Sequence, residues 1–384
     1  MLWLNFLHFY QPATAEKETM VAAIISSYTR ITKALLKNPR IKFTVNVSGC
    51  LLEKINEFGY QALLDSLRKL AQRGQLELVG TAAYHPLLPL IPPTEAAKQI
   101  KLQEELLGKF IGEPRGRGFF LPEMAYSPAA AQLIKTLGYE WLILDEISGG
   151  KAGALDCGQV YVDAQSGLKI IFRERLLSQS YVPNTVAKLI ATERAAAVTA
   201  TDAELYGLRY TDLSGNFEKL LRDDRLQTLT ISEFMGQSPP AKKIKIIPSS
   251  WESTVPELRA GKPYALWYDD NNLLQKKLWR LSRLAWETVG RFDADYQHLW
   301  AERHLRQGLA SCTFWWASGR DFKNLFGSLS WSPDEIERGV NELTKAVRSL
   351  DDSASRPAKI KAEKICLEIK KIIWNKHWKY YWKK

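Results

Sequence analysis

Two carboxylates stand directly after apolar segments of the sequence, at the points where those segments stop. Glu123 closes the run "GFFLPE", and Asp202 closes the run "AAAVTATD". Two acids at one site can divide the chemistry: one stays ionised and attacks, while the other holds a proton and donates it. The rigid backbone of Pro122 favours Glu123 as the attacking member. A lone acid at a strand end is more often a helix cap or a solvated loop residue, so the prediction depends on finding both.

Polar and aromatic side chains follow several other apolar segments. His8 and Gln11 follow the first segment, and His85 lies in the loop "GTAAYHPLLPL" after a later one. The sequence has no GxSxG turn and no cysteine beside these histidines, which argues against a Ser or Cys nucleophile. Carboxylates, histidines and aromatic residues are instead typical of glycosidases. We therefore expect His8 and His85 to bind sugar hydroxyls and Trp251 to stack on a sugar, with core packing of Trp251 as the alternative.

Histidines at strand ends also raise the alternative of a metal-dependent polysaccharide deacetylase. Such a site would need an acid beside the first strand and two closely spaced histidines on one loop. The first segment ends in "LHFYQP" without an acid, and the five histidines form no HxH, HxxH or HxxxH pair. No GxGxxG or GxxxxGK[ST] follows an apolar segment either, which argues against nucleotide binding. We therefore expect neither a metal nor an organic cofactor.

The elements that carry these residues alternate in type over the first two-thirds of the chain. Short apolar runs alternate with amphipathic segments, a pattern typical of βα units and a parallel sheet. Predicted strands lie at 2–8, 41–47, 75–80, 116–122, 140–145, 196–202 and 226–234, with helices at 15–37, 60–73, 94–110 and 128–137. Six or seven strands in this length favour a barrel over an open sheet, and in such a barrel the reactive groups gather at the carboxyl ends of the strands.

A change of pattern marks a second region. The segment 239–264 contains five prolines, and beyond it the pattern is wholly helical, with helices predicted at 272–290, 295–310, 332–350 and 358–380. The sequence therefore predicts an α/β barrel over residues 1–265, followed by a helical bundle over 266–384.

The positive charge of the chain is concentrated at its end. Of the net charge of +11, the stretch 355–384 contributes +8, from ten Lys/Arg and two Glu. A basic, solvated outer face on a packed terminal helix explains this pattern, and attachment to anionic lipid or nucleic acid is the alternative. We expect no nucleic-acid partner.

Cysteine usage and hydropathy bear on the compartment. The four cysteines form no CxxC pair and predict buried free thiols in a reducing environment; they are Cys50, Cys157, Cys312 and Cys366. The apolar start "MLWLNFLHFYQP" lacks the basic region of a signal peptide and reads as a strand. No run of about 18 apolar residues predicts a membrane span. We expect a cytoplasmic protein.

Five ordered motifs resemble those of glycoside hydrolase family 57, the retaining enzymes that act on α-glucans. The motifs are "HFYQP" (8–12), "GTAAYHPLLPL" (80–90), "FFLPEMAY" (119–126), "TDAELYG" (201–207) and "GLASCTFWWAS" (308–318). The segments "FRERLLS" (172–178) and "SSWES" (249–253) also resemble stretches of amylase-like members. The resemblance implies an incomplete seven-stranded (β/α) barrel followed by a helical bundle.

The resemblance also implies roles for individual residues. The nucleophile falls on Glu123 and the general acid/base on Asp202. Substrate-binding roles are expected for His8, Gln11, His85, Phe120, Trp251, Trp315 and Trp316. Two positions depart from the family pattern: Phe120 stands where Trp is common, and Leu208 stands where His is common.

The expected activity is α-amylase-type hydrolysis of α-1,4-glucans or maltooligosaccharides through a glycosyl-enzyme. A 4-α-glucanotransferase or a branching enzyme would use the same catalytic residues and differ only in what accepts the sugar. An alternative of another class is a catalytically silent glucan-binding protein. Such a protein would keep the aromatic residues and lose the acids, whereas this sequence retains Glu123 and Asp202.

Overall fold

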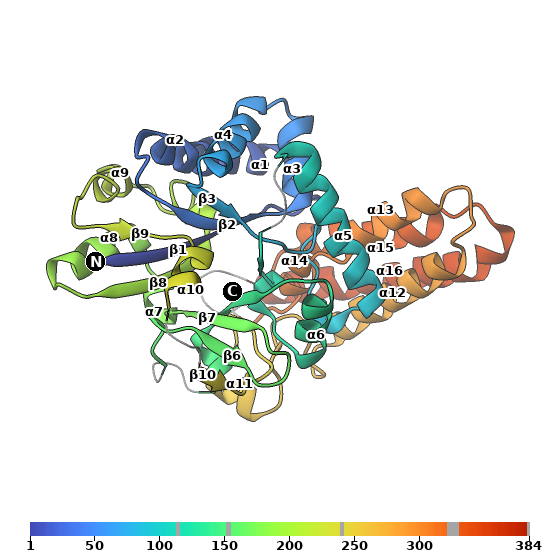
Figure 1. The fold of residues 1–384 in the computed structure, drawn as a ribbon. Helices are drawn as coiled ribbons and strands as arrows, with labels where there is room; N and C mark the ends of the chain where they lie inside the picture. The colour runs from blue at the N-terminus through green and yellow to red at the C-terminus, as the bar shows by residue number, and fades with distance from the viewer. Residues whose placement is uncertain (113–115, 151–154, 239–241, 321–329, 382–384) are drawn as a thin grey trace. The chain divides into compact units, whose positions relative to one another are not determined.

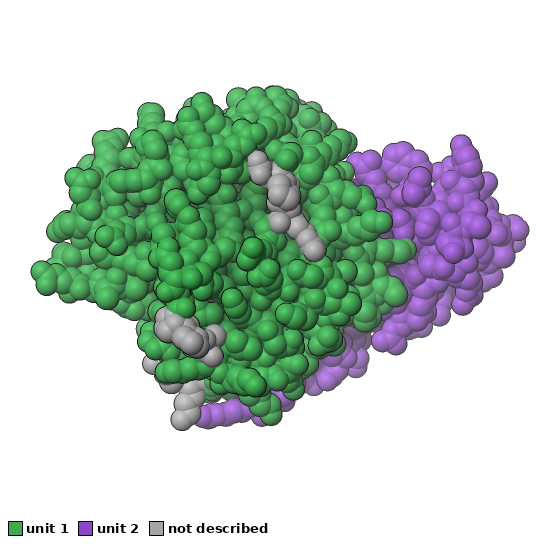
Figure 2. All heavy atoms as spheres, viewed as in Figure 1, with its two compact units in different colours: residues 1–11, 15–83, 88–255 green, residues 12–14, 84–87, 256–384 purple. Residues whose placement is uncertain are grey.

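The computed structural model describes residues 1–112, 116–150, 155–238, 242–320 and 330–381. The chain forms two compact units, coloured separately in Figure 2. Unit 1 comprises Met1–Gln11, Ala15–Ala83 and Leu88–Val255, and unit 2 comprises Pro12–Thr14, Tyr84–Leu87 and Pro256–Lys384. The chain changes unit several times, and the last change lies between Val255 and Pro256. The assignment of residues 1–265 to a barrel and 266–384 to a bundle stays a prediction.

Sheet A of unit 1 is built around the first strand. Strand β1 (Leu2–Phe9) pairs in parallel with β2 (Phe43–Val47), β8 (Ala196–Asp202) and β9 (Gln227–Thr228), and β3 (Leu76–Leu78) pairs with β2. Every residue of β1 after the first is buried, as expected for a parallel strand covered on both faces. The register places His8 opposite both Asn46 and Asp202, so the ends of three strands lie together.

Sheet B contains the remaining strands of unit 1 in the order β10-β6-β7-β5-β4. Figure 1 labels three of them, β10, β6 and β7. Strands β4 (Gly118–Phe119), β5 (Trp141–Asp145) and β7 (Lys169–Arg173) run parallel. Strand β6 (Tyr161–Asp163) is antiparallel to β7, and β10 (Lys242–Ile244) is parallel to β6. The sheet is therefore mixed, with its parallel part next to Glu123 and Asp145.

Backbone hydrogen bonds connect the two sheets on both sides. The Gly80 N–H donates to the Gly118 carbonyl at 2.9 Å, and the Phe120 N–H donates to the Gly80 carbonyl at 2.8 Å. On the other side, the Glu174 N–H donates to the Val198 carbonyl at 2.9 Å. Gly80 is required here because a Cβ would lie 2.3 Å from the Tyr139 hydroxyl oxygen. These bonds align the strand ends of one sheet with those of the other.

The predicted helices of unit 1 are confirmed, with one difference in detail. The segment 15–37 consists of α1 (Lys17–Ala23), a π-helical turn η1 (Ile24–Tyr28) and α2 (Thr29–Lys37). The others are α4 (Gln61–Gln72), α5 (Pro93–Phe110) and α6 (Pro128–Thr136). Shorter helices not predicted are α3 (Gly49–Glu57), α7 (Arg175–Ser178), α8 (Val182–Ala191), α9 (Asn216–Leu220), α10 (Ile231–Gln237) and α11 (Val255–Arg259).

Two predictions about strands need correction. The strand predicted over 226–234 is wrong beyond Gln227–Thr228, because Thr230 and Glu233 form a capping box that begins helix α10. Strand β7 was missed, although it lies beside β5 and precedes the connection to β8. Its short apolar stretch, "IIF", is enclosed between basic residues and gives too brief a periodic signal.

The described part of unit 2 is helical, as predicted for the end of the chain. Its long helices are α12 (Leu273–Arg291), α13 (His298–Gly308), α15 (Pro333–Arg348) and α16 (Arg356–Tyr381), with the short α14 (Ser311–Trp315) between them. Helix α15 packs against α12, α13, α14 and α16. Ile365, Ile369 and Ile373 are buried on α16, so this basic helix packs through an apolar face as expected.

The cysteine prediction is confirmed in that all four thiols are free. Cys50, Cys157 and Cys366 are buried, and Cys312 is partly exposed. Among the residues that the structure describes, no helix combines the length and the apolar character needed to cross a bilayer.

Candidate active site

Glu123 is held in an unusual backbone conformation at the end of β4. It lies in the turn Pro122–Met124, and both Glu123 (φ 61°) and Met124 (φ 48°) adopt left-handed backbone angles. Such angles cost on the order of 1–3 kcal/mol for residues other than glycine, and they persist where surrounding contacts enforce them. Trp251 provides two of those contacts. Its indole Nε1 donates to Glu123 Oε2 at 2.8 Å, and its backbone N–H donates to the Glu123 carbonyl at 3.1 Å.

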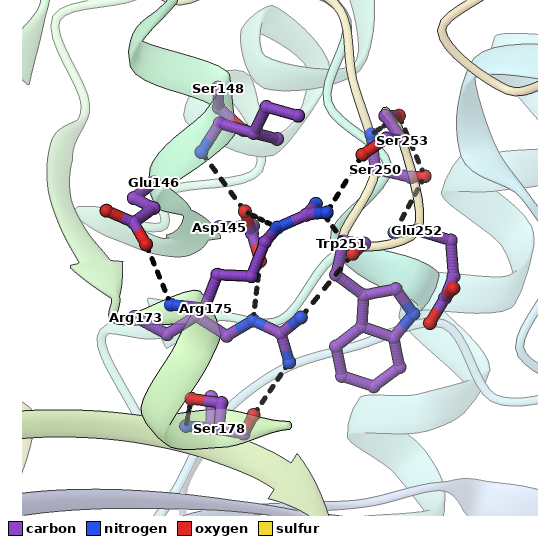
Figure 3. A network of polar contacts seen from close by, with 12 residues as sticks. Asp145, Glu146, Ser148, Arg173, Arg175, Ser178, Ser250, Trp251, Glu252 and Ser253 are labelled. Atoms are coloured by element: carbon purple, nitrogen blue, oxygen red, sulfur yellow. Dashed lines mark hydrogen bonds and ion pairs between the residues drawn. The ribbon is translucent and has the colours of Figure 1, made fainter. Parts of the chain in front are cut away.

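A buried ionic network holds Trp251 in place (Figure 3). Asp145, at the end of β5, is fully buried and accepts from Arg173 Nε at 2.8 Å and from Arg175 Nε at 2.9 Å. Arg175 Nη2 donates to the Trp251 carbonyl at 2.8 Å, and the Arg173 guanidinium lies 4.9 Å from the centre of the Trp251 ring. Arg175 Nη1 also donates to the Ser253 carbonyl at 2.9 Å. The two arginines therefore connect the end of β5 to the segment that holds Glu123.

Contacts of Tyr126, which follows the turn that contains Glu123, also hold residues 249–251 next to that turn. Tyr126 and Ser249 form an antiparallel bridge, in which the Tyr126 N–H donates to the Ser249 carbonyl at 2.8 Å. The Tyr126 hydroxyl donates to the buried Asp163 at 2.9 Å. The turn around Glu123 is thus attached to residues 249–251 at both of its ends.

An aromatic cluster lies next to Glu123. The His8 ring centre is 4.7 Å from that of Phe120 and 6.2 Å from that of Trp251, and Phe120 is 5.8 Å from Trp251. His8 Nδ1 is 2.9 Å from Asn46 Oδ1, which orients the imidazole. Phe120 is fully buried and also stacks on Phe6 at 5.1 Å. Phe120 thus lies behind His8 and Trp251, away from solvent.

Asp202 stands at the end of β8, directly beside the end of β1. Its strand partner in the register is His8, which connects it through the aromatic cluster to Trp251 and Glu123. Arg209 Nη1 donates to Asp202 Oδ2 at 2.9 Å, and 24 % of the Asp202 side chain is exposed. Arg209 directly follows Leu208, the residue that stands where His is common in the family pattern. The charged partner of Asp202 therefore comes from the next position in the chain.

A second carboxyl group, Glu204, lies two residues beyond Asp202 and is almost completely buried. Gln11 Nε2 donates to Glu204 Oε1 at 2.7 Å, and the Tyr28 hydroxyl oxygen lies 2.5 Å from the same atom. Burial is the main cause that raises the pKa of Glu204 to about 7; the charge of Asp202 adds to this effect, and the charge of Arg209 opposes it. Gln11, expected to bind substrate, thus has its amide engaged with Glu204.

The remaining candidates belong to unit 2. His85 is buried, has a left-handed backbone (φ 57°), and accepts at its carbonyl from the Ser311 N–H at 2.9 Å. Pro86 and Ala310 form an antiparallel bridge, which brings the second and fifth family-like motifs together. The rings of Trp315 and Trp316 are half-buried, 4.6 Å apart and nearly perpendicular. Substrate contact by these residues stays a prediction.

Sequence reasoning missed the most heavily connected residues of the site. The family-like stretch "FRERLLS" contains Arg173 and Arg175, but the sequence predicts neither their ion pairs with Asp145 nor a role for the carboxyl group of Glu204. The available signal was position: each of these polar side chains ends or closely follows a buried strand. Within the described residues, no group of three or more His, Cys, Asp or Glu side chains could hold a metal ion.

Two carboxylates therefore stand at separate strand ends, one held by an indole and one paired with arginine. Residues 4–247 match the family described as glycosyl hydrolase family 57, and the chain belongs to this family. It is 31 % identical over 153 residues to an α-amylase of Pyrococcus horikoshii, covering 39 % of this chain and 24 % of that protein. It is 32 % identical over 156 residues to a 4-α-glucanotransferase of Thermococcus kodakarensis, covering 40 % of this chain and 23 % of that protein.

Solved structures of the family share the fold over nearly the whole chain. A 4-α-glucanotransferase from Thermococcus litoralis matches with a TM-score of 0.70 at 20 % identity, covering 91 % of this chain and 60 % of that one. A branching enzyme from Pyrococcus horikoshii matches with a TM-score of 0.69 at 15 % identity, covering 95 % of this chain and 94 % of that one. The match to the curated relatives, by contrast, spans only about a quarter of their length.

Proposed function

We propose that this protein is a retaining glycoside hydrolase that acts on α-1,4-glucans through a glycosyl-enzyme intermediate. The observation that carries the proposal is the fixed position of Glu123, whose carboxylate accepts from Trp251 and whose backbone is held in a left-handed turn at a strand end. Membership of family 57 and similarity to proteins named α-amylase and 4-α-glucanotransferase support the choice of α-glucan as substrate.

The proposed reaction proceeds in two steps. The Glu123 carboxylate attacks the anomeric carbon as the bond to the leaving oxygen breaks, and Asp202 gives its proton to that oxygen. Asp202 then takes a proton from water, and the resulting nucleophile displaces Glu123 with a second inversion at the same carbon. Net retention follows. It requires the two carboxyl groups to lie about 5–5.5 Å apart when substrate is bound, rather than the roughly 6.5–9.5 Å of an inverting enzyme.

We further infer that the two sheets of unit 1 form the incomplete seven-stranded barrel of the family. The order β1-β2-β3-β4-β5-β7-β8 is supported by the strand pairings and by the backbone bonds at Gly80 and Glu174. In this arrangement Glu123, Asp145 and Asp202 all stand at carboxyl ends of strands, where barrels carry their chemistry. Unit 2 would then correspond to the helical bundle.

Substrate contacts are proposed for the predicted set, with roles adjusted to their surroundings. Trp251 donates to Glu123 and His8 lies against the Trp251 ring, and both would bind the sugar that Glu123 attacks. Phe120 is fully buried and would support those two rings, and Gln11 would act through Glu204. For His85, Trp315 and Trp316, the proposed role rests on their place in the family-like motifs. No nucleic-acid partner is proposed, because the basic residues concentrate on the outer part of a packed helix.

Incubation with maltoheptaose, followed by chromatography of the products, tests the function. Hydrolysis yields shorter oligomers down to maltose and glucose, and we expect this result. A ladder of longer oligomers would instead indicate the 4-α-glucanotransferase alternative, and new α-1,6 linkages on amylose would indicate branching. Glu123→Gln should abolish turnover. If the wild type binds glucan without turning over any of these substrates, the protein is a glucan-binding protein and the enzyme proposal fails.

A further inference from the structure

Helix α16 has apolar residues on two opposite sides, and only one side is covered by protein. The covered side packs against α12 and α15 of unit 2. Its buried residues are Ala362, Ile365, Cys366, Ile369 and Ile373. On the other side, Ile360 is 48 % exposed, Leu367 is 66 % exposed and Trp378 is 50 % exposed. The packing of unit 2 therefore explains one apolar side of this helix and leaves the other without a function.

The exposed apolar residues lie in line with exposed lysines. At 3.6 residues per turn, five positions fall within a sector of about 60° and extend over about 27 Å of the helix. They form the outer stripe, which consists of Ile360, Lys364, Leu367, Lys371 and Trp378. Single exposed apolar residues are ordinary on a protein surface, whereas a repeat of four, three, four and seven positions is that of an amphipathic helix face.

The lysines of this face lack anionic partners. Lys364 and Lys371 lie within the outer stripe, and Lys361 and Lys379 lie beside it; all four are exposed. None of the four forms an ion pair among the residues that the structure describes. Four positive charges therefore stand next to three exposed apolar side chains.

The glutamates of α16 do not neutralise these lysines, because each is paired with another helix. Glu363 is 3.3 Å from Arg348 of α15, and Glu368 is 2.5 Å from Lys277 of α12. No other acidic residue occurs between positions 355 and 384. The outer side of α16 therefore keeps an uncompensated positive charge.

We propose that the outer stripe binds the surface of an anionic lipid membrane, with α16 parallel to that surface. Lysines attract anionic headgroups, and apolar side chains on the same face enter the boundary between headgroups and acyl chains. Tryptophan favours this interface as well, which suits Trp378. A nucleic acid would also attract the lysines, but Ile360 and Leu367 offer no ring on which a base could stack. The exposed aliphatic residues therefore favour lipid.

Vesicle sedimentation tests the proposal on the full chain. One set of vesicles consists of phosphatidylcholine alone, and the other contains phosphatidylcholine and phosphatidylserine at about 3:1. We expect the protein to sediment with the anionic vesicles at about 50 mM salt, to be released at about 500 mM salt, and not to sediment with the neutral vesicles. If it does not sediment with the anionic vesicles at low salt, the proposal is wrong. The readout is binding, so the result is independent of the proposed glycosidase activity.

Replacement of two lysines tests the contribution of charge. Each lysine near an anionic surface contributes about fivefold to binding, so Lys364→Gln combined with Lys371→Gln should weaken binding by about 25-fold. The matched control is Lys101→Gln combined with Lys135→Gln, which removes the same charge from exposed positions on α5 and α6. This control should bind as the wild type does. Equal weakening in both double variants would show that only net charge matters and would overturn the assignment to α16.

Replacement of two aliphatic residues separates lipid from other polyanions. Ile360→Ser combined with Leu367→Ser should weaken binding to the anionic vesicles by about tenfold, because these side chains would no longer enter the interface. Leu176→Ser combined with Leu213→Ser is the control, since both residues are highly exposed in unit 1. Thermal unfolding of each variant shows that it is folded. If the aliphatic variant binds vesicles as the wild type does, while the lysine variant loses vesicles and single-stranded RNA alike, the stripe is a general polyanion surface and the assignment to lipid fails.

Discussion

The surroundings of Glu123 and Asp202 differ in the kind of partner that each acid has. Glu123 accepts from the Trp251 indole N–H, and behind that indole lie Arg173, Arg175 and a buried Asp145. Asp202 accepts from a cation, Arg209, which also lies 3.7 Å from the buried carboxyl group of Glu204. A neutral donor thus holds the acid that we propose as the nucleophile, and a charged side chain holds the acid that we propose as the proton donor.

The mechanical support of the two acids differs as well. Glu123 is held by Trp251, whose carbonyl accepts from Arg175 and whose ring lies against the Arg173 guanidinium at the end of β7. The left-handed backbone of Glu123 shows that its surroundings outweigh its own preference. Asp202 ends a regular strand with an ordinary extended backbone. A nucleophile must keep its position relative to the anomeric carbon, while an acid must mainly control a proton. Glu123 is thus distinguished by a fixed backbone, and Asp202 by the charged groups around its carboxylate.

The largest expected effect is the loss of activity when either acid is replaced. The leaving group of the substrate should distinguish the two replacements. Glu123→Gln should lower kcat by about 10⁴-fold or more on any α-glucan substrate, because no other group can form the covalent intermediate. Asp202→Asn should be comparably impaired on maltoheptaose. It should still release 4-nitrophenol from a 4-nitrophenyl maltooligoside in a burst, because this leaving group needs no protonation. Stopped-flow measurement of nitrophenol release checks this. Equal loss in both variants would remove the division of roles.

Breaking the buried ionic network should have the next largest effect, on stability. Arg173→Met leaves the fully buried Asp145 with one of its two partners and should destabilise unit 1 by about 3–5 kcal/mol. Denaturant unfolding followed by tryptophan fluorescence measures the change. Arg225→Met is the control, because Arg225 forms an exposed pair with Asp223 and its loss should leave the free energy of unfolding almost unchanged. Similar values for the two variants would contradict the importance assigned to the network.

Removal of the indole donor should give a smaller effect, confined to activity. Trp251→Phe keeps an aromatic ring but loses the N–H that donates to Glu123, and a hydrogen bond to a charged group is worth about 1.5–3 kcal/mol, or roughly 10- to 150-fold in kcat/KM. The control is Trp141→Phe, which removes an indole donor to Ser232 elsewhere in unit 1. Steady-state kinetics on maltoheptaose distinguishes them. Equal losses of activity would show that the effect is one of packing.

The sequence predicted most helices and the strands that carry the two acids. Strand β8 has the predicted limits, and Asp202 is its last residue. Helices α4, α5, α6 and α12 lie within one or two residues of their predicted ranges. These successes concern long periodic segments, where each residue contributes to a repeated local signal. Strand β7 was not predicted, because its three apolar residues between charged ones are too few to show a periodic pattern.

The strand predicted over 226–234 failed for another reason. Its residues have high strand propensity, but Thr230 and Glu233 provide a capping box and begin a helix after only two paired residues. Local hydrogen bonds of two polar side chains therefore outweighed the propensity of their neighbours.

The sequence by itself determined which acids stand at strand ends, the family to which the chain belongs, and the helical nature of its final part. Only the tertiary structure decided how those acids are held. Trp251 and Glu123 are separated by 128 positions, and Glu204 and Gln11 by 193. Such pairings follow from strand register and burial, which depend on the whole fold. A pattern of neighbouring residues can therefore place a carboxyl group at a strand end, but the hydrogen-bond partners of that group come from distant parts of the chain.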